Sequence, residues 1–338
     1  MPVTLEPPRT HAAPARVALG ANNNGPAIRI GLINNMPDSA LLSTEAQFGG
    51  LLEKASNTVQ VKLLLTSFPE LPRGPEALAH IERTYWALDD LLREPMDAVI
   101  VTGTEPRAPH LPDEPYWHRF GQVLEWAESR THASIWSCLA AHAAVLSLDG
   151  VARQRMAEKR SGVYEHETSP GHPLLAGTPA RLCTPHSRWN ELSVEALRKA
   201  GYQILSWSAA SGADAFVRRG RSLMLFFQGH PEYEDTTLLK EYRRDVTRYL
   251  SAQQPHYPTL PHGYFSEDAT GVLEAFRREA LATRSPELME RFPFAALAAG
   301  LTNSWSDSAV TIYRNWLTYI ASAKSRTLAA EPVSLADS

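Results

Sequence analysis

Cysteine is scarce in this chain of 338 residues, which contains only Cys138 and Cys183. Two cysteines are too few for a disulfide scaffold and favour a reducing compartment. No apolar run approaches the ~18 residues that a membrane-spanning helix needs. The first residues also lack the basic start and apolar stretch of a secretory signal. We therefore expect a cytoplasmic protein that does not contact a membrane.

An excess of one charge is also absent, because 33 basic and 37 acidic residues give a net charge of -4. Without a basic excess the chain lacks the electrostatic footprint of a nucleic-acid-binding protein, so we expect no nucleic-acid partner. The 12 histidines do not fall at metal-ligand spacings, and neither H-E-x-x-H nor C-x-x-C occurs. The sequence therefore predicts no bound metal.

Apolar strand-like segments alternate with helical segments in the first half of the chain. The predicted strands are 28–34, 59–65, 97–101 and 133–136, with a helix over 115–130. Such alternation predicts an α/β fold: a mostly parallel central sheet with helices on both faces. Ligands bind outside the carboxyl ends of the strands in sheets of this kind.

The second half is more mixed. Segments 213–218 and 222–227 flank Arg-Gly-Arg, which predicts a hairpin. Helices are expected over 193–200, 236–252, 270–282 and 306–323.

From the sequence we expect one domain over residues 27–326. Residues 1–26 are rich in proline and alanine and end in an Asn-Gly-Pro breaker, so we expect a mobile leader there. We expect residues 327–338 to form a loose tail. The apolar face of the last helix, around 313–320, suits either the core or an interface.

Cys138 stands where a buried strand ends and a helix rich in alanine and leucine begins. The positive end of a helix dipole favours the thiolate and can lower a thiol pKa from about 8.5 to roughly 3.5–7.5. The plainer alternative is a small residue filling the core. His230 and Glu232 follow a second apolar strand. If both strands end at one edge of the sheet, these three side chains supply a nucleophile, a base and an orienting group.

A strand-end cysteine followed later by His-Pro-Glu resembles the class I glutamine amidotransferase fold, which is flavodoxin-like. Further blocks occur in the order found in homoserine O-acyltransferases related to homoserine O-succinyltransferase. The resemblance covers residues 27 to about 322. The blocks that contain Ser161–His166 and Pro185–Arg188 are specific to that family. The blocks are Asn35-Met36-Pro37, Thr44-Glu45-Ala46-Gln47-Phe48, Val101-Thr102-Gly103, Glu158-Lys159-Arg160-Ser161-Gly162-Val163-Tyr164-Glu165-His166, Pro185-His186-Ser187-Arg188, Gly229-His230-Pro231-Glu232-Tyr233, Arg244-Asp245-Val246 and Asn315-Trp316-Leu317.

This resemblance implies an acyltransferase of methionine synthesis that moves an acyl group from an acyl-CoA to the hydroxyl of L-homoserine. Acyl-CoA would be a co-substrate, with no permanently bound cofactor, and a homodimer is implied. Cys138 would attack the thioester, with His230 as the base and Glu232 orienting it. The backbone N–H groups at Gly103 and Leu139 are candidates for an oxyanion hole.

Three further family positions fall near the expected substrates. Arg244 is implied to hold the amino-acid carboxylate, which agrees with the bidentate geometry of a guanidinium. Lys159 would meet negative charge on the acyl donor or the reaction centre, and Ser187 would hydrogen-bond the acceptor. Taken without the resemblance, these residues have plainer alternatives: a surface ion pair, a solvated lysine and a loop-capping hydroxyl.

Arg107 occupies the family position that helps to choose the acyl donor, where glycine accompanies succinyl and glutamate accompanies acetyl. An arginine there can pair with the free carboxylate of a succinyl group, so we favour succinyl-CoA. Solvent or the CoA phosphates are alternative partners. An acetyl-CoA donor, or serine as acceptor, stays open. A glutamine amidotransferase subunit is disfavoured because residues 136–140 lack Gly-x-Cys-x-Gly, and a non-enzymatic module is disfavoured because all three triad residues are present.

Overall fold

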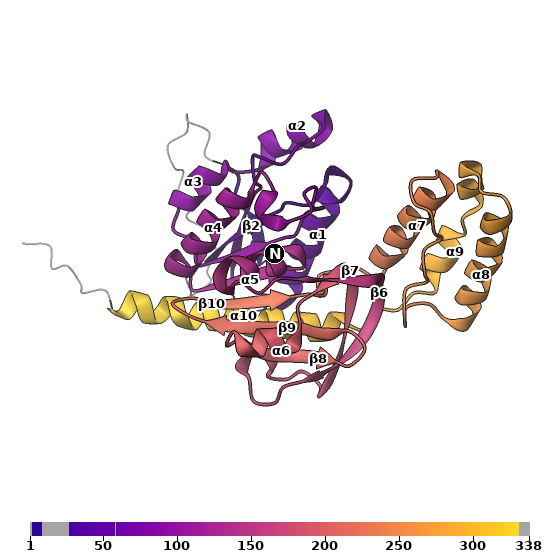
Figure 1. Cartoon of the computed structure of the whole chain (residues 1–338). Helices are drawn as coiled ribbons and strands as arrows, with labels where there is room; N and C mark the ends of the chain where they lie inside the picture. Colours follow the sequence, from indigo (N-terminus) through magenta and orange to yellow (C-terminus); the bar gives the residue numbers. More distant parts are fainter. Residues whose placement is uncertain (1, 9–26, 58, 331–338) are drawn as a thin grey trace, which may run out of the picture.

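The centre of the molecule is a sheet of ten strands (Figure 1). The computed structural model describes residues 2–8, 27–57 and 59–330. Six neighbouring strands are parallel: in spatial order β1 (Val3–Leu5), β3 (Val61–Thr66), β2 (Ile28–Ile33), β4 (Ala98–Val101), β5 (Ala133–Ser137) and β10 (Leu223–Phe227). Four antiparallel strands extend the sheet from β10: β9 (Gly212–Arg219), β8 (Gln203–Ser208), β6 (Gln154–Thr168) and β7 (Arg181–Glu191).

Helices cover both faces of the parallel part, as the sequence predicts. Helices α1 (Asp38–Ala55) and α10 (Ser306–Ala330) pack on one face, and α4 (Trp117–Arg130), α5 (Leu139–Asp149) and α6 (Val194–Lys199) on the other. Each face of the sheet has its own hydrophobic core. Ile135 belongs to the core under α1 and α10, and the next residue, Trp136, belongs to the core on the opposite face. Strands buried on both faces must be apolar throughout rather than alternating, which explains their strong signal in the sequence.

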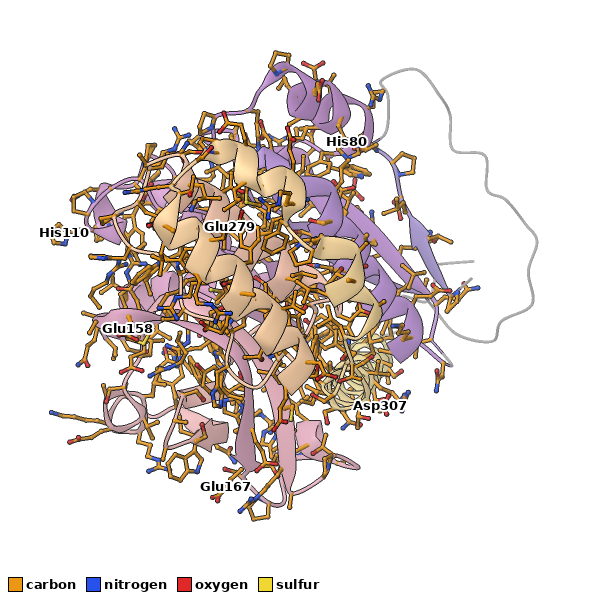
Figure 2. The ribbon with its side chains drawn as sticks, turned by 90° about the vertical axis from the view of Figure 1, so that its right-hand side faces the viewer. His80, His110, Glu158, Glu167, Glu279 and Asp307 are labelled. Carbon is orange, nitrogen blue, oxygen red and sulfur yellow. The ribbon has the colours of Figure 1, made fainter. Side chains whose placement is uncertain are left out.

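A third core lies mostly within a helical group beside the sheet and includes Val163 of β6 (Figure 1). It joins α7 (Thr237–Leu250), α8 (Glu267–Ala282) and α9 (Phe294–Ala299). Figure 2 looks onto this group, with Glu279 marking α8. None of the helices in the described part of the chain has the length and apolar character that crossing a bilayer requires.

The structure changes the expected chain ends. Residues 3–5, which the sequence places in the leader, form β1 and pair with Val61–Leu63 of β3. A strand of three residues is too short to produce a periodic signal. Residues 327–330, which the sequence places in the loose tail, belong to α10. The rest of the leader, residues 9–26, and residues 331–338 lie outside the described residues.

Several other elements were missed. Strand β6 is long, polar and mostly half-buried or exposed, so it lacks an apolar signature. Two short helices precede β4: α2 (Pro75–Thr84), which has no buried residues, and α3 (Leu88–Arg93). The apolar face of α10 is core, because Tyr313, Trp316 and Ile320 are fully buried.

Candidate active site

Cys138 forms a sharp turn between β5 and α5. Its backbone has φ 53° and ψ -112°, a conformation that non-glycine residues rarely adopt. The N–H of Cys138 donates to the carbonyl of Phe227 at 2.8 Å, which ties the turn to the end of β10. The turn places the thiol at the N-terminus of α5, where the helix dipole favours a thiolate. A strained strand-to-helix turn with this placement is typical of a catalytic nucleophile.

His230 and Glu232 follow the neighbouring strand, since β10 pairs with β5 and Phe227 lies beside Ser137. Nδ1 of His230 and Oε1 of Glu232 are 2.8 Å apart, and both side chains are buried. The imidazole also hydrogen-bonds Cys138 and stacks on Tyr233. The structure thus brings the thiol, the imidazole and the carboxylate together at one edge of the sheet.

The electrostatics around His230 favour an imidazolium. Burial, the largest contribution, lowers its pKa, but the negative charges of Cys138 and Glu232 and its hydrogen bonds to both outweigh burial. The pKa of His230 consequently lies well above its ordinary value. A protonated imidazole beside the sulfur stabilises the thiolate, which is the nucleophilic form of cysteine.

The triad opens into a cavity lined by side chains from the sheet edge and from α7. Of the residues singled out in the sequence, this cavity contains Gly103, Cys138, Leu139, Lys159, Ser187, His230, Glu232 and Arg244. Residues more than one hundred positions apart in the chain thus share one space. The antiparallel extension contributes Lys159 and Ser187, from β6 and β7, and the helical group contributes Arg244.

Two carboxylates in this cavity escaped the sequence analysis. Glu241 accepts hydrogen bonds from Ser187 Oγ and from the Tyr233 hydroxyl. Asp245 pairs with Lys159 Nζ at 2.6 Å and with Arg244 at 3.2 Å. Their spacing on the helix of Arg244 could have revealed them, because residues three and four apart on a helix share one face. Glu241 and Asp245 therefore flank the face on which Arg244 was expected to act.

Gly103 lies against the first residue of α5. A Cβ added to it would stand 3.0 Å from the backbone nitrogen of Leu139, closer than almost any real Cβ contact. The glycine thus lets the loop after β4 approach the turn of the nucleophile. The first N–H groups of a helix have no partner within the helix, so that of Leu139 is suited to bind an oxyanion.

Arg107 is the predicted site residue that the structure does not place in the Cys138 cavity. It is exposed and lines an adjoining cavity, which shares Pro37, Thr104 and Glu105 with the first. Its backbone N–H is held by the buried carboxylate of Glu114. Within the described ranges, no ion pair or hydrogen bond occupies its guanidinium.

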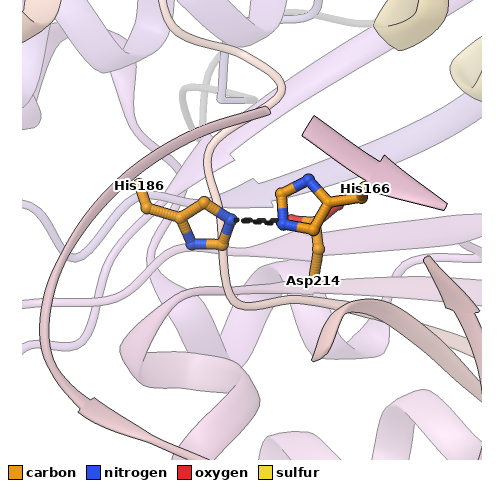
Figure 3. A group of neighbouring side chains, drawn as sticks. All are labelled: His166, His186 and Asp214. Carbon is orange, nitrogen blue, oxygen red and sulfur yellow. Dashed lines mark hydrogen bonds and ion pairs between the residues drawn. The ribbon is translucent and has the colours of Figure 1, made fainter. Parts of the chain in front are cut away.

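A second group of chemically capable side chains lies in the antiparallel part of the sheet. His166, His186 and Asp214 place one potential ligand atom each within 4.8 Å of one another (Figure 3). They come from β6, β7 and β9, which explains why spacing along the sequence did not reveal them. All three are buried, and none lines the Cys138 cavity.

Comparison with known proteins shows the family to which the chain belongs. A family model described as homoserine O-succinyltransferase matches residues 10–326. A homoserine O-succinyltransferase from Rhodopseudomonas palustris is 44% identical over 295 residues, covering 87% of this chain and 89% of that protein. The one from Bradyrhizobium japonicum is 43% identical over 295 residues, covering 87% and 90%. Among solved structures, a glutamine amidotransferase from Thermotoga maritima is 14% identical with a TM-score of 0.47, covering 87% of this chain and 98% of that one.

Proposed function

Because the chain belongs to the homoserine O-succinyltransferase family, we propose that it transfers a succinyl group from succinyl-CoA to the hydroxyl of L-homoserine through a thioester on Cys138. The observation that carries the mechanism is the meeting of Cys138, His230 and Glu232 at two adjacent strand ends in one cavity. The reaction needs no permanently bound cofactor.

In the first half-reaction the Cys138 thiolate attacks the thioester carbonyl of succinyl-CoA. A bond forms between Sγ and the carbonyl carbon, and the bond from that carbon to the CoA sulfur breaks. His230 donates its proton to the departing CoA thiolate. The N–H groups at Leu139 and Gly103 stabilise the oxyanion that forms between these events; losing one such donor typically costs about 10²–10³ in rate.

In the second half-reaction homoserine occupies the space between α7 and the acyl-cysteine. Arg244 binds its carboxylate, and the carboxylates of Glu241 and Asp245 suit its ammonium group. Ser187 hydrogen-bonds the acceptor. The homoserine oxygen loses its proton to His230 and attacks the acyl carbon, and the Cys138 thiolate leaves.

The electrostatics of His230 suit both steps in turn. In the free enzyme the charges of Cys138 and Glu232 raise its pKa against the effect of burial. Acylation converts the thiolate into a neutral thioester and removes one of these charges. The pKa of His230 then falls, because a charge that raised it is gone while burial still lowers it. The group that donates a proton to CoA in the first step thereby becomes the base that homoserine needs.

The donor side of the site involves Lys159 and Arg107. Lys159 contributes positive charge beside the reaction centre. Arg107, in the adjoining cavity, has a guanidinium with no partner among the described residues, and it pairs with an anionic part of the donor. We assign this part to the succinyl carboxylate, which distinguishes succinyl-CoA from acetyl-CoA.

We place the reaction in the cytoplasm. Both cysteines are free, which agrees with a reducing compartment. The proposed site residues all come from one chain, so the mechanism does not depend on the homodimer that the resemblance implies.

The mechanism is tested by intact-protein mass spectrometry after incubation with succinyl-CoA alone. We expect the mass to increase by one succinyl group. Cys138→Ala should abolish the increase, and the matched control Cys183→Ala should retain it. An active enzyme without any adduct would contradict the covalent mechanism.

Donor and acceptor specificity is tested by steady-state kinetics with four pairs of substrates. We expect kcat/KM to be highest for succinyl-CoA with homoserine. Faster transfer from acetyl-CoA would reassign the donor, and faster transfer to serine would reassign the acceptor. Glutamine hydrolysis in place of transfer would indicate an amidotransferase.

A further inference from the structure

The buried cluster of His166, His186 and Asp214 lies next to the loop that carries Gly229 and His230. Their exposed fractions are 0, 0 and 1%. The Nε2 atoms of the two histidines are 3.3 Å apart, drawn as the dashed line in Figure 3. Nε2 of His186 lies 3.4 Å from Oδ1 of Asp214. Buried polar groups at such distances must satisfy one another or bind something, because leaving them unpaired is costly.

The proton positions favour a hydrogen-bonded network over a metal site. Arg188 Nε donates to Nδ1 of His186 at 3.2 Å. Burial, and then the charge of Arg188, lower the pKa of His186 well below its ordinary value, so the ring is neutral with a single N–H. That N–H is therefore on Nε2, whose hydrogen-bond partner is Nε2 of His166. Oδ1 of Asp214 lies 3.4 Å from the same nitrogen and has no hydrogen-bond partner among the described residues. A metal ligand would need a lone pair on Nε2, and a cation would face the nearby guanidinium.

The network touches the catalytic loop without an intervening side chain. Gly229 precedes His230, and a Cβ added to it would stand 2.6 Å from Oδ1 of Asp214 and 2.6 Å from Cγ2 of Thr184. The N–H of His230 donates to the carbonyl of Pro185 at 2.8 Å. The loop that carries His230 thus rests on Asp214 and on segment 184–185.

Asp214 is itself held firmly. Its Oδ2 accepts hydrogen bonds from Thr184 Oγ1 at 3.0 Å and from Ser206 Oγ at 2.9 Å. Its backbone carbonyl accepts from the N–H of Gln228 at 2.8 Å. Through its carboxylate Asp214 therefore connects β7 and β8, and through its backbone carbonyl it holds the residue that follows β10. The chain continues from His186 to Ser187, whose hydroxyl lines the active-site cavity.

We propose that Asp214 and His186 form a positioning element that sets the placement of His230 against Cys138 and of Ser187 against the acceptor. The proposal rests on the proposed role of His230 as the base. Neither residue touches substrate; both act through Gly229 and Pro185. A shift of about 1 Å in a reacting group can cost on the order of 10²-fold in rate, so a small displacement of this support is sufficient to be measurable.

The first test measures the reactivity of Cys138 rather than turnover, so it does not depend on the identity of the substrate. In a Cys183→Ala background, the rate of alkylation by iodoacetamide is followed against pH by mass spectrometry. The alkylation rate reports how His230 is placed against the Cys138 sulfur. For Asp214→Asn we expect the alkylation midpoint to move to higher pH and the rate near pH 6 to fall about tenfold or more.

A milder variant covers the case in which Asp214→Asn does not fold. Thr184→Val removes the hydroxyl that donates to Asp214 but keeps the methyl group against Gly229. It should shift the midpoint in the same direction by a smaller amount. The matched control is Asp97→Asn, because Asp97 is also a buried carboxylate, paired with Lys324 and the N–H of Arg29 at the far end of the sheet. The control should lower thermal stability and leave the midpoint unchanged.

The second test is steady-state kinetics on the same proteins. Asp214→Asn should lower kcat and raise the KM for homoserine, since both His230 and Ser187 depend on this support. If the wild type lacks succinyl transfer, the proposed function fails, while alkylation still decides the positioning role.

Two results would overturn the proposal. One is an Asp214→Asn protein that loses stability like Asp97→Asn but keeps the wild-type alkylation profile and kinetics. The other is stoichiometric zinc in the purified protein that disappears in His186→Asn, which would make the cluster a metal site.

Discussion

Replacing Glu232 by glutamine tests the electrostatics of the triad most directly. The carboxylate is 2.8 Å from Nδ1 of His230, and its side chain is only 5% exposed, so solvent hardly screens the pair. A hydrogen bond to a charged group contributes about 1.5–3 kcal/mol. At about 1.4 kcal/mol per tenfold, losing the charge alone costs on the order of 10- to 100-fold in rate.

The carboxamide adds a second cost. Its NH₂ group can donate to Nδ1 of His230, which leaves the imidazole proton on the nitrogen facing Cys138. The ring then cannot act as a base; the equivalent change in Ser-His-Asp enzymes costs about 10⁴. We expect Glu232→Gln to lower kcat by about 10²–10⁴ while the KM for homoserine changes little, because Arg244 and Glu241 remain.

The pH profile supplies an independent readout. Glu232 is one of the charges that raise the pKa of His230. Its removal lowers that pKa, so the imidazolium is lost at a lower pH. The alkaline limb of the first half-reaction, measured by stopped-flow release of CoA, should therefore move to lower pH. Glu232→Asp, which keeps the charge, should recover part of the rate. Wild-type rates with an unmoved alkaline limb in Glu232→Gln would refute the assigned role.

Three further substitutions test other parts of the site. Gly103→Ala places a Cβ 3.0 Å from the backbone nitrogen of Leu139; we expect kcat to fall about 10²–10³ at nearly unchanged thermal stability, and normal turnover would exclude this N–H from the oxyanion hole. Arg244→Lys keeps the charge but loses the bidentate fork, so the KM for homoserine should rise about tenfold or more with succinyl-CoA acylation of Cys138 unchanged. Arg107→Gly should raise the KM for succinyl-CoA much more than that for acetyl-CoA; equal increases would assign Arg107 to the CoA moiety instead.

The sequence predicted well wherever a local rule determines structure. Buried parallel strands are continuously apolar, so β2, β3, β4 and β5 were recognisable, as was the hairpin of β9 and β10. Strand β6 was not, because its polar side chains are mostly half-buried or exposed and share no apolar face. The pairing of β6 with β7 and β8 depends on distant partners.

The features of the site also divide into those that a local pattern predicts and those that depend on distant residues. The junction of strand and helix at Cys138 is local, and so is the short separation of His230 and Glu232, which suffices for their hydrogen bond. The partners of Arg244 and Lys159 are not local: the helical group brings Glu241 and Asp245 into the cavity, where they pair with cations from two different elements.

By itself, the sequence determined the buried parallel strands with their main helices, the cysteine at a helix N-terminus and the family blocks. Each of these depends on neighbouring residues or on linear order. Only the tertiary structure decided that β5 and β10 lie side by side, that Arg107 faces a separate cavity, and that a buried Asp214 supports the loop of His230. These features depend on which distant strands pair, and packing of the whole sheet determines that pairing.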